Sequence, residues 1–180
     1  MNKKEIKRKT IAKSCCELFA KNGFTNISVE MIAKNAGIGK GTVYEYFAKK
    51  EDIVLELMGC LQEEYDENFK NQSALITNPT EKLFFLFDIF LGTNEKVILQ
   101  REIYKQFLIV TLIFPSDTIL QYHQEMRNKY ISIIQMISDE FDGELIFDTI
   151  IGFFTISLST KDYDLSKNIT KYLNKTGGTY

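Results

Sequence analysis

The sequence predicts an all-α protein, and three observations support this fold class. Apolar residues recur at spacings of three and four along most of the 180-residue chain, which is the period of a helix with one buried face. No segment shows the alternation of apolar and polar residues that is typical of a half-buried strand. Residues 28–50 read as two short helices joined by a glycine turn. We therefore expect a three-helix, helix-turn-helix head at the N-terminus, followed by a larger helical bundle.

The two short helices have recognisable ends. The hydroxyl of Ser28 can cap the first helix, and Gly37 can adopt the positive φ that ends it and turns the chain. A second helix is expected over residues 39–47, where Val43 and Phe47 lie four apart and can pack on the first. This second helix begins at a glycine, which has no side chain to cap it. Its other faces carry hydroxyls and a lysine, as expected of a recognition helix that enters the major groove of DNA.

Longer helices are expected on both sides of this motif. An apolar stripe from about Lys4 to Lys21 predicts one helix that supports the motif, and Cys15 lies on this stripe, which predicts a packing role for its thiol. Acidic residues at the start of the next helix, near Lys50, favour a long helix that runs to about Asn71. A polar loop is expected over residues 72–79.

The remainder of the chain predicts five more helices. Thr80 is expected to cap the first of them, Pro115 to end the second, and Asp142-Gly143 to separate the third from the fourth. The tail TGGTY at the C-terminus is expected to be frayed. The expected helical ranges are 80–92, 94–114, 117–141, 144–159 and 164–174.

The charge of the chain is distributed unevenly. Residues 1–50 hold eleven basic and four acidic residues, a net charge of +7, whereas the remainder holds eleven basic and twenty acidic residues, a net charge of −9. The overall net charge of −2 therefore hides a basic head on an acidic body. A basic head favours a polyanionic partner such as nucleic acid.

Other classes of protein fit the sequence poorly. Three cysteines, two of them adjacent, cannot form a disulfide framework, and the N-terminus lacks the apolar run of a signal peptide, so we expect a cytoplasmic protein. The most apolar segment, Leu145–Leu158, is shorter than the roughly 18–20 residues that a membrane span needs. The single histidine, His123, has no companion residues at catalytic or metal-ligand spacing. We therefore expect no enzymatic activity, no catalytic or metal site and no cofactor.

An ordered set of short motifs over residues 11–57 resembles the DNA-binding head of the TetR family of bacterial transcriptional regulators. Each piece alone is weak, but their order and spacing together are specific. Gly39 departs from the family pattern, in which a serine or another small capping residue is more frequent. The matching pieces are Leu18-Phe19, Gly23-Phe24, Ile32-Ala33, Ala36-Gly37, Lys40-Gly41-Thr42, Tyr44, Tyr46-Phe47 and Lys50-Glu51.

The resemblance implies a domain organisation and a function. Residues 1–50 would form the DNA-binding domain, and residues 51–180 would form a C-terminal bundle for effector binding and dimerisation. The protein would be a repressor that binds a palindromic operator as a homodimer through the recognition helix near residues 39–47. A small hydrophobic effector would release it from DNA, although an effector acting as a co-repressor stays open. By match to the family, the DNA contacts would be Ser28, Lys40, Gly41, Thr42, Tyr44, Tyr46 and Lys50.

The resemblance also implies an effector pocket and a dimer interface in the C-terminal bundle. Aromatic and flexible side chains on the three helices that resemble the family's pocket walls are candidates for the pocket, with Asp88 able to face a cationic ligand. The pocket candidates are Phe87, Asp88, Phe90, Tyr104, Phe107, Tyr122, His123, Met126 and Tyr130. The last two helices would pair between subunits, with candidates Phe147, Ile150, Ile151, Phe154, Leu158, Ile169 and Leu173.

An effector can act only by preferring one arrangement of the two heads over another. A dimer that reads successive major grooves holds its recognition helices about 34–36 Å apart. We expect the effector to swing the long helix that begins near Glu51 and so to change this spacing. The alternative is a DNA-binding helical dimer that has no small-molecule pocket and is controlled by a protein partner.

Overall fold

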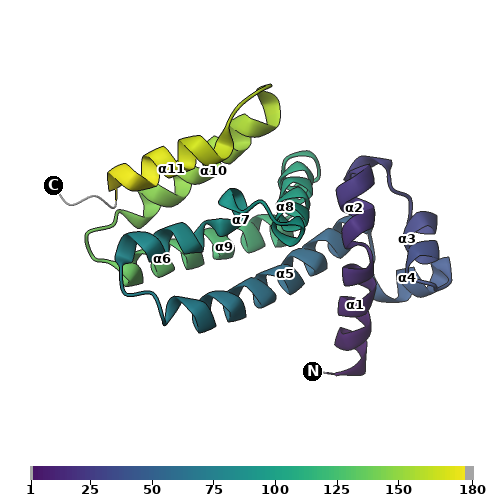
Figure 1. Ribbon diagram of the computed structural model, residues 1–180. Helices are drawn as coiled ribbons and strands as arrows, with labels where there is room; N and C mark the ends of the chain where they lie inside the picture. Colours follow the sequence, from purple (N-terminus) through teal and green to yellow (C-terminus); the bar gives the residue numbers. More distant parts are fainter. Residues whose placement is uncertain (1, 177–180) are drawn as a thin grey trace. The chain divides into compact units, whose positions relative to one another are not determined.

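The computed structural model describes residues 2–176 of the chain, and the regular elements within this range are all helical, which confirms the predicted fold class (Figure 1). The residues 177–180 of the tail that we expected to be frayed lie outside the described range. The elements are α1 (Lys3–Ser14), α2 (Cys16–Asn22), the 3-10 helix η1 (Phe24–Asn26), α3 (Val29–Asn35), α4 (Lys40–Tyr46), α5 (Lys50–Ser73), α6 (Pro79–Leu86), α7 (Asp88–Leu91), α8 (Glu95–Ile113), α9 (Asp117–Ile137), α10 (Gly143–Ser159) and α11 (Leu165–Thr176).

The chain folds into two compact units. The first unit contains the N-terminal residues up to Asp66 together with Ile98–Ile119, and the second contains Glu67–Val97 together with the residues from Leu120 onward. The first unit therefore combines the helix-turn-helix with most of α8, a helix from the middle of the chain. The division at residue 50 that the resemblance implies is a separate expectation, and it stays a prediction.

The supporting helix at the N-terminus is interrupted at Cys15, so the prediction of one continuous helix was wrong. The hydroxyl of Ser14 donates to the carbonyl of Ile11 at 2.7 Å, and Cys15 N donates to the carbonyl of Ala12 at 3.0 Å, one residue short of the regular helical partner. The side chain of Cys15 is fully buried, which confirms its predicted packing role. Burial also raises the pKa of its thiol.

Helix α8 is attached to the helix-turn-helix by a buried hydrogen bond. The backbone N–H of Phe24 donates to Oε1 of Gln106 at 2.8 Å, across 82 residues of sequence, and the Gln106 side chain is buried. The rings of Phe24 and Phe114 meet edge to face with centroids 5.5 Å apart. Without Gln106 the buried N–H of Phe24 would lose its partner, at a cost of about 1–3 kcal/mol. The core of the head therefore includes Gln106 and Phe114, which are far from it in the sequence.

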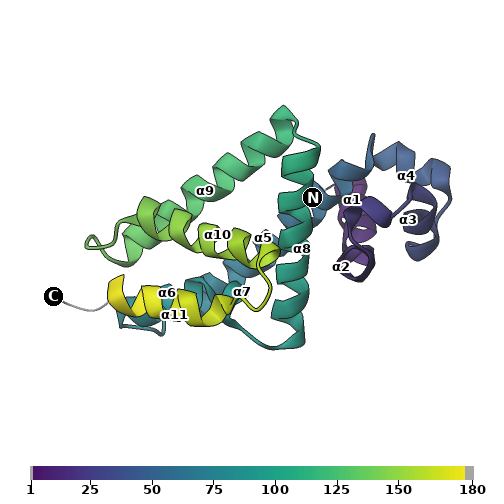
Figure 2. The ribbon, with the colours of Figure 1, turned by 90° about the horizontal axis from the view of Figure 1, so that it is seen from above.

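In the second unit, α11 packs against α10 and also against α6 and α7 (Figures 1 and 2). Its Ile169 and Leu173 are fully buried. Helix α6 begins earlier than we predicted, because Asn78 rather than Thr80 is its cap: Asn78 Oδ1 accepts from Glu81 N at 3.1 Å, and Pro79 occupies the first helical position. The C-terminal helix is thus held on more than one side within its own chain.

Candidate nucleic-acid interface

The recognition helix α4 is anchored by its apolar face and exposes its polar one. Val43 and Phe47 are 1% and 2% exposed and hold the helix against the head core. On the other side, Lys40, Gly41 and Tyr44 are exposed, with Tyr44 at 51%. The predicted anchors of this helix are confirmed, and the side chains that remain accessible on it are polar.

The two helices of the motif are joined as the sequence predicts. Ser28 Oγ accepts from Met31 N at 3.3 Å and caps α3, while Gly37 takes a φ of 65° in the turn. Gly39 begins α4 without a side-chain cap. Ser28 is exposed, whereas Thr42 and Tyr46 are half-buried. The residues assigned to DNA contact on these two helices thus lie at exposed or partly exposed positions.

Lys40 forms an ion pair on this surface. Its ammonium donates to the carboxylate of Glu30 on α3. The hydrogen bond from Lys40 lowers the pKa of Glu30 to about 2 and raises the pKa of Lys40, so the pair is ionised at neutral pH. Because the folded-state pKa of Glu30 is depressed, the pairing operates above the ordinary value of 4.5 and is lost as the pH falls towards 2. A phosphate that binds Lys40 must therefore compete with Glu30.

Lys50 is half-buried and bonds to backbone groups of the head. Its Nζ donates to the carbonyl oxygens of Phe24 at 2.8 Å and Ile27 at 2.7 Å, and it lies 4.2 Å from the centroid of the Phe24 ring. Burial lowers the pKa of Lys50. The side chain is thus directed into the protein.

Arg8 is a functional candidate that the sequence reading missed. Its guanidinium donates to the carbonyl of Tyr46, the last residue of α4, and lies 4.4 Å above the centroid of the Phe47 ring. Its Nε also donates to Glu56 of α5 at 2.9 Å. Arg8 carries no motif signal, because its partners lie 38 and 48 residues away.

The acidic side chains of α5 neutralise part of the basic head. Besides Arg8, Lys9 pairs with Glu63 at 2.5 Å and Lys13 pairs with Glu64 at 2.6 Å. These ion pairs join α1 to α5 within the first unit. The net charge of +7 counted over residues 1–50 therefore overstates the positive charge that the head offers to a polyanion.

The residues assigned to an effector pocket fall into both compact units. Tyr104 and Phe107 belong to the first unit, and the other seven belong to the second. Within the second unit, Phe90 lies against Phe154 with centroids 5.1 Å apart, and Tyr130 stacks on Phe147 at 5.6 Å. The side chains of Phe87, Phe90, Tyr104, Phe107, Met126 and Tyr130 are buried, and those of Asp88, Tyr122 and His123 are intermediate.

The pKa of His123, one of the pocket candidates, is displaced. Burial, and secondarily the positive charge of Arg127, lowers its pKa below the ordinary value, so the imidazole is neutral at physiological pH. Arg127 is itself held by Asp148 through two hydrogen bonds of 2.9 and 2.7 Å. Among residues 2–176, no group of His, Cys, Asp and Glu side chains is arranged to hold a metal ion.

Most residues assigned to a dimer interface lie in the interior of the chain's own fold. Ile151 is intermediate and Leu158 is 38% exposed. Two neighbouring apolar residues of α10, Leu145 at 57% and Ile156 at 45%, are more exposed. The remaining five are at most 3% exposed, and a partner could not reach them without rearrangement: Phe147, Ile150, Phe154, Ile169 and Leu173.

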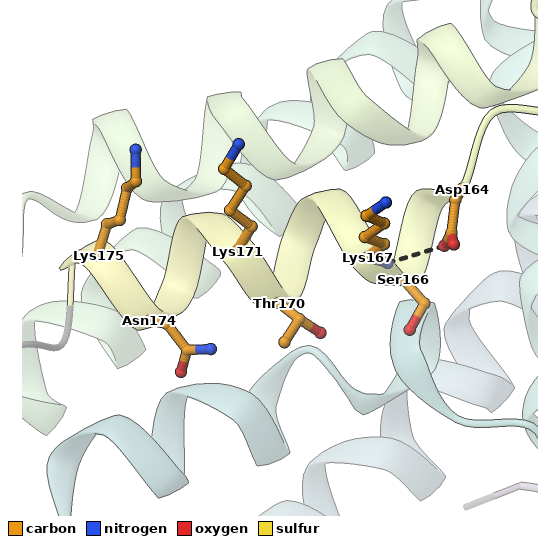
Figure 3. Close-up of a pocket in the computed structure, with 7 residues that line it drawn as sticks. All are labelled: Asp164, Ser166, Lys167, Thr170, Lys171, Asn174 and Lys175. Carbon is orange, nitrogen blue, oxygen red and sulfur yellow. Dashed lines mark hydrogen bonds between the residues drawn. The ribbon is translucent and has the colours of Figure 1, made fainter.

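The exposed side of α11 is basic (Figure 3). It borders an open hollow of about 850 Å³, and Lys167, Lys171 and Lys175 follow one another at four-residue spacing along it. Asp164 Oδ1 caps this helix by accepting from Lys167 N at 2.9 Å. Across the described part of the chain, no helix is both long enough and apolar enough to span a bilayer.

Helices α3 and α4, joined by a turn at Gly37 and with the polar face of α4 exposed, have the architecture of a helix-turn-helix. Residues 11–57 match the sequence model described as "Bacterial regulatory proteins, tetR family". Among curated relatives, QacR of Staphylococcus aureus is 27% identical over 124 residues, which cover 69% of this chain and 64% of QacR. The fatty acid metabolism regulator protein of Bacillus subtilis is 38% identical over 78 residues, 41% of this chain and 40% of that protein.

Solved structures share the fold over nearly the whole chain. A transcriptional regulator from Saccharomonospora viridis in complex with choline superposes with a TM-score of 0.74 at 16% identity and covers 94% of both chains. The multidrug binding protein EbrR complexed with malachite green gives 0.69 at 14% identity, covering 96% of this chain and 98% of EbrR. Residues 11–57 are therefore similar to the DNA-binding head of TetR-family transcriptional regulators, and the described chain shares the fold of the solved structures above. The curated matches nevertheless span less than two thirds of either relative.

Proposed function

We propose that the protein is a repressor that binds a palindromic operator as a homodimer and leaves it when a small hydrophobic effector binds. The observation that carries the DNA-binding part is the polarity of α4: Val43 and Phe47 anchor it, while Tyr44 and the residues at its N-terminus remain exposed. Exposed hydroxyls, a lysine and a glycine suit contacts to phosphates and base edges. Ser28, Lys40, Gly41, Thr42, Tyr44 and Tyr46 are the proposed contacts.

The effector part of the proposal is supported by two related folds with bound ligands. Choline and malachite green, which occupy the S. viridis regulator and EbrR, are both organic cations. In the sequence, Asp88 follows Phe87 and precedes Phe90 by two residues, and a carboxylate among aromatic residues suits a cation of this kind. We therefore propose a hydrophobic organic cation as the effector class.

The dimer part of the proposal rests on the exposed sides of the last two helices. Leu145, Ile156 and Leu158 on α10 offer apolar contact area, and the lysines of α11 offer positive charge. Glu144 on α10 is exposed and could meet such a lysine from a second copy. A two-fold arrangement would use both complementary features twice.

Signal transfer is proposed to run through α5 and α8 together. Both contribute residues to the first unit, and α8 is bonded to the head through Gln106. An effector that prefers one arrangement of these helices would change the spacing of the two recognition helices, which DNA requires to be about 34–36 Å.

Selection of genomic DNA by the protein tests this function. Fragments captured at 50 mM and 200 mM salt are sequenced, and we expect the fragments retained at the higher salt to share a palindrome. Malachite green is then titrated against the protein bound to such a fragment, and release is expected. Failure to enrich any fragment refutes the DNA-binding function. Enrichment without release by malachite green contradicts the proposed effector class and leaves control by a protein partner as the alternative.

Tyr44→Phe is expected to weaken operator binding by about 5- to 10-fold, the loss of one hydrogen bond worth about 1–1.4 kcal/mol. Affinity is measured by fluorescence anisotropy on a captured fragment. Tyr163→Phe, at a half-buried tyrosine of the loop after α10, serves as the control and should leave affinity unchanged. Equal affinity of Tyr44→Phe and the wild type would show that the hydroxyl of Tyr44 makes no contact with DNA.

Glu30→Gln is expected to tighten binding by about threefold and to steepen the dependence of log K on log salt by up to about 0.9, because Lys40 becomes available to a phosphate. The control is Glu17→Gln, which releases Lys21 from an equivalent exposed pair of 2.8 Å on α2. Weaker binding by Glu30→Gln would mean that the ion pair orders α4 rather than competing with DNA.

A further inference from the structure

Lys50 holds the start of the helix-turn-helix in place. The two carbonyls that accept from its Nζ belong to Phe24, in η1, and to Ile27, the residue directly before the cap of α3. The ammonium also lies above the ring of Phe24, which is 1% exposed. The ammonium of Lys50 therefore fixes the loop that precedes α3. The two carbonyls that it binds lie 26 and 23 residues before it in the sequence.

Arg8 holds the other end of the motif in a matching way. The carbonyl of Tyr46 is at the C-terminal end of α4, where carbonyls lack helical partners and the helix dipole favours a cation. The guanidinium lies above the buried ring of Phe47 and is fixed from behind by Glu56 of α5, whose side chain is 19% exposed. Arg8 therefore ties the end of the recognition helix to the long helix.

Both cations use most of their N–H donors inside the protein. An ammonium has three N–H donors, and two of those of Lys50 are used by carbonyl oxygens. The guanidinium of Arg8 is divided between a carbonyl and a carboxylate. A phosphate that drew these donors away would leave the carbonyls of Phe24, Ile27 and Tyr46 without these partners.

We propose that Arg8 and Lys50 are positioning residues that set the orientation of the recognition helix, and so its sequence preference, without contacting phosphate. The proposal rests on the proposed DNA-binding function. It reassigns Lys50 from the contact that the resemblance implies, and it adds a residue of α1 that no motif marks. Base-edge contacts require correct placement of α4, whereas the electrostatic attraction to any duplex does not.

The test uses Lys50→Met and Arg8→Met, which remove the charge and keep much of the apolar stem. The matched control is Lys49→Met, which removes an equal charge from an exposed neighbouring side chain. Each full-length variant is titrated with a duplex that the wild type has selected from a random pool, and with an unselected duplex of the same length, over 50–200 mM KCl. Circular dichroism verifies that each variant is folded at the temperature used.

We expect both variants to lose about tenfold in affinity for the selected duplex, equivalent to about 1.4 kcal/mol. Affinity for the unselected duplex and the salt dependence should match those of Lys49→Met. A phosphate contact gives a different result, since it lowers affinity for both duplexes alike and reduces the salt slope by about 0.9. That result for either variant overturns the assignment of the residue concerned.

Hydrogen exchange of backbone amides gives a second readout that needs no DNA. Lys50→Met should speed exchange in the first turn of α3 and Arg8→Met in α4, each by about tenfold, with other helices unchanged. Lys50→Arg should restore slow exchange, because a guanidinium can donate to both carbonyls. Unchanged exchange in α3 and α4 overturns the proposal. If exchange is faster in the variants but the wild type selects no duplex, the positioning role stands and only the DNA-binding function is refuted.

Discussion

Gly41→Leu is expected to lower operator affinity at least about 100-fold, roughly 2.8 kcal/mol, without destabilising the protein. An ideal Cβ at Gly41 has no atom within 4 Å, so a side chain fits the fold. The position is exposed on α4, while Val43 and Phe47 occupy the buried face. If DNA approaches the backbone at this glycine, a leucine fills the space that a base edge or a phosphate needs.

The controls for Gly41→Leu separate DNA contact from folding. Gly41→Ala should weaken DNA binding less, and it should stabilise the helix by roughly 0.5–1 kcal/mol. Gly59→Ala, on α5, also has open space around its Cβ and should bind DNA as the wild type does. Affinity is measured by anisotropy and stability by urea unfolding. Wild-type affinity of Gly41→Leu would show that DNA does not approach α4 at this residue.

Phe24→Ala is expected to reduce the free energy of unfolding by about 3–5 kcal/mol. The ring is 1% exposed and is shared by three neighbours: Phe19, with centroids 6.2 Å apart, Phe114 at 5.5 Å, and the ammonium of Lys50 at 4.2 Å. Removing it leaves a cavity where α2, α8 and the start of α5 meet. The measurement is urea denaturation followed by far-ultraviolet circular dichroism.

Phe24→Leu is the matched variant for this prediction. It keeps most of the buried volume and should cost less than about 1.5 kcal/mol. Because the backbone N–H and carbonyl remain, the bonds to Gln106 and Lys50 can persist in both variants. A loss below about 1 kcal/mol for Phe24→Ala would mean that the surrounding helices close over the cavity or that this region is not part of the cooperative core.

The recognition helix lacks a side-chain cap at its N-terminus but is bonded to Arg8 at its C-terminus. Gly39 offers no capping side chain, which the sequence shows directly. At the other end, Arg8 bonds to the last carbonyl of α4, and this contact depends on α1 folding across the motif. A helix with a poor N-terminal cap can thus be ordered from its C-terminus, although no residue within α4 or beside it indicates this.

The apolar pattern of the last two helices was interpreted as surplus surface for a partner subunit. Five of the seven residues named on that basis are instead covered within the chain, since α11 packs on α6 and α7 as well as on α10. Periodicity shows that a face is buried, but it carries no information about which helix buries it. The exposed Leu145 and Ile156 are therefore the better candidates for a partner, and they remain a proposal.

The sequence by itself determined the all-α fold, the ends of the motif helices at Ser28 and Gly37, and the anchored and exposed faces of the recognition helix. These features depend on residues within a few positions of one another, and helix geometry converts their spacing into a face or a cap. Only the tertiary structure decided how the cations of the head are used. Arg8, Lys50 and Gln106 reach backbone groups 23–82 residues away, and such pairings are set by how helices cross, which local spacing does not encode.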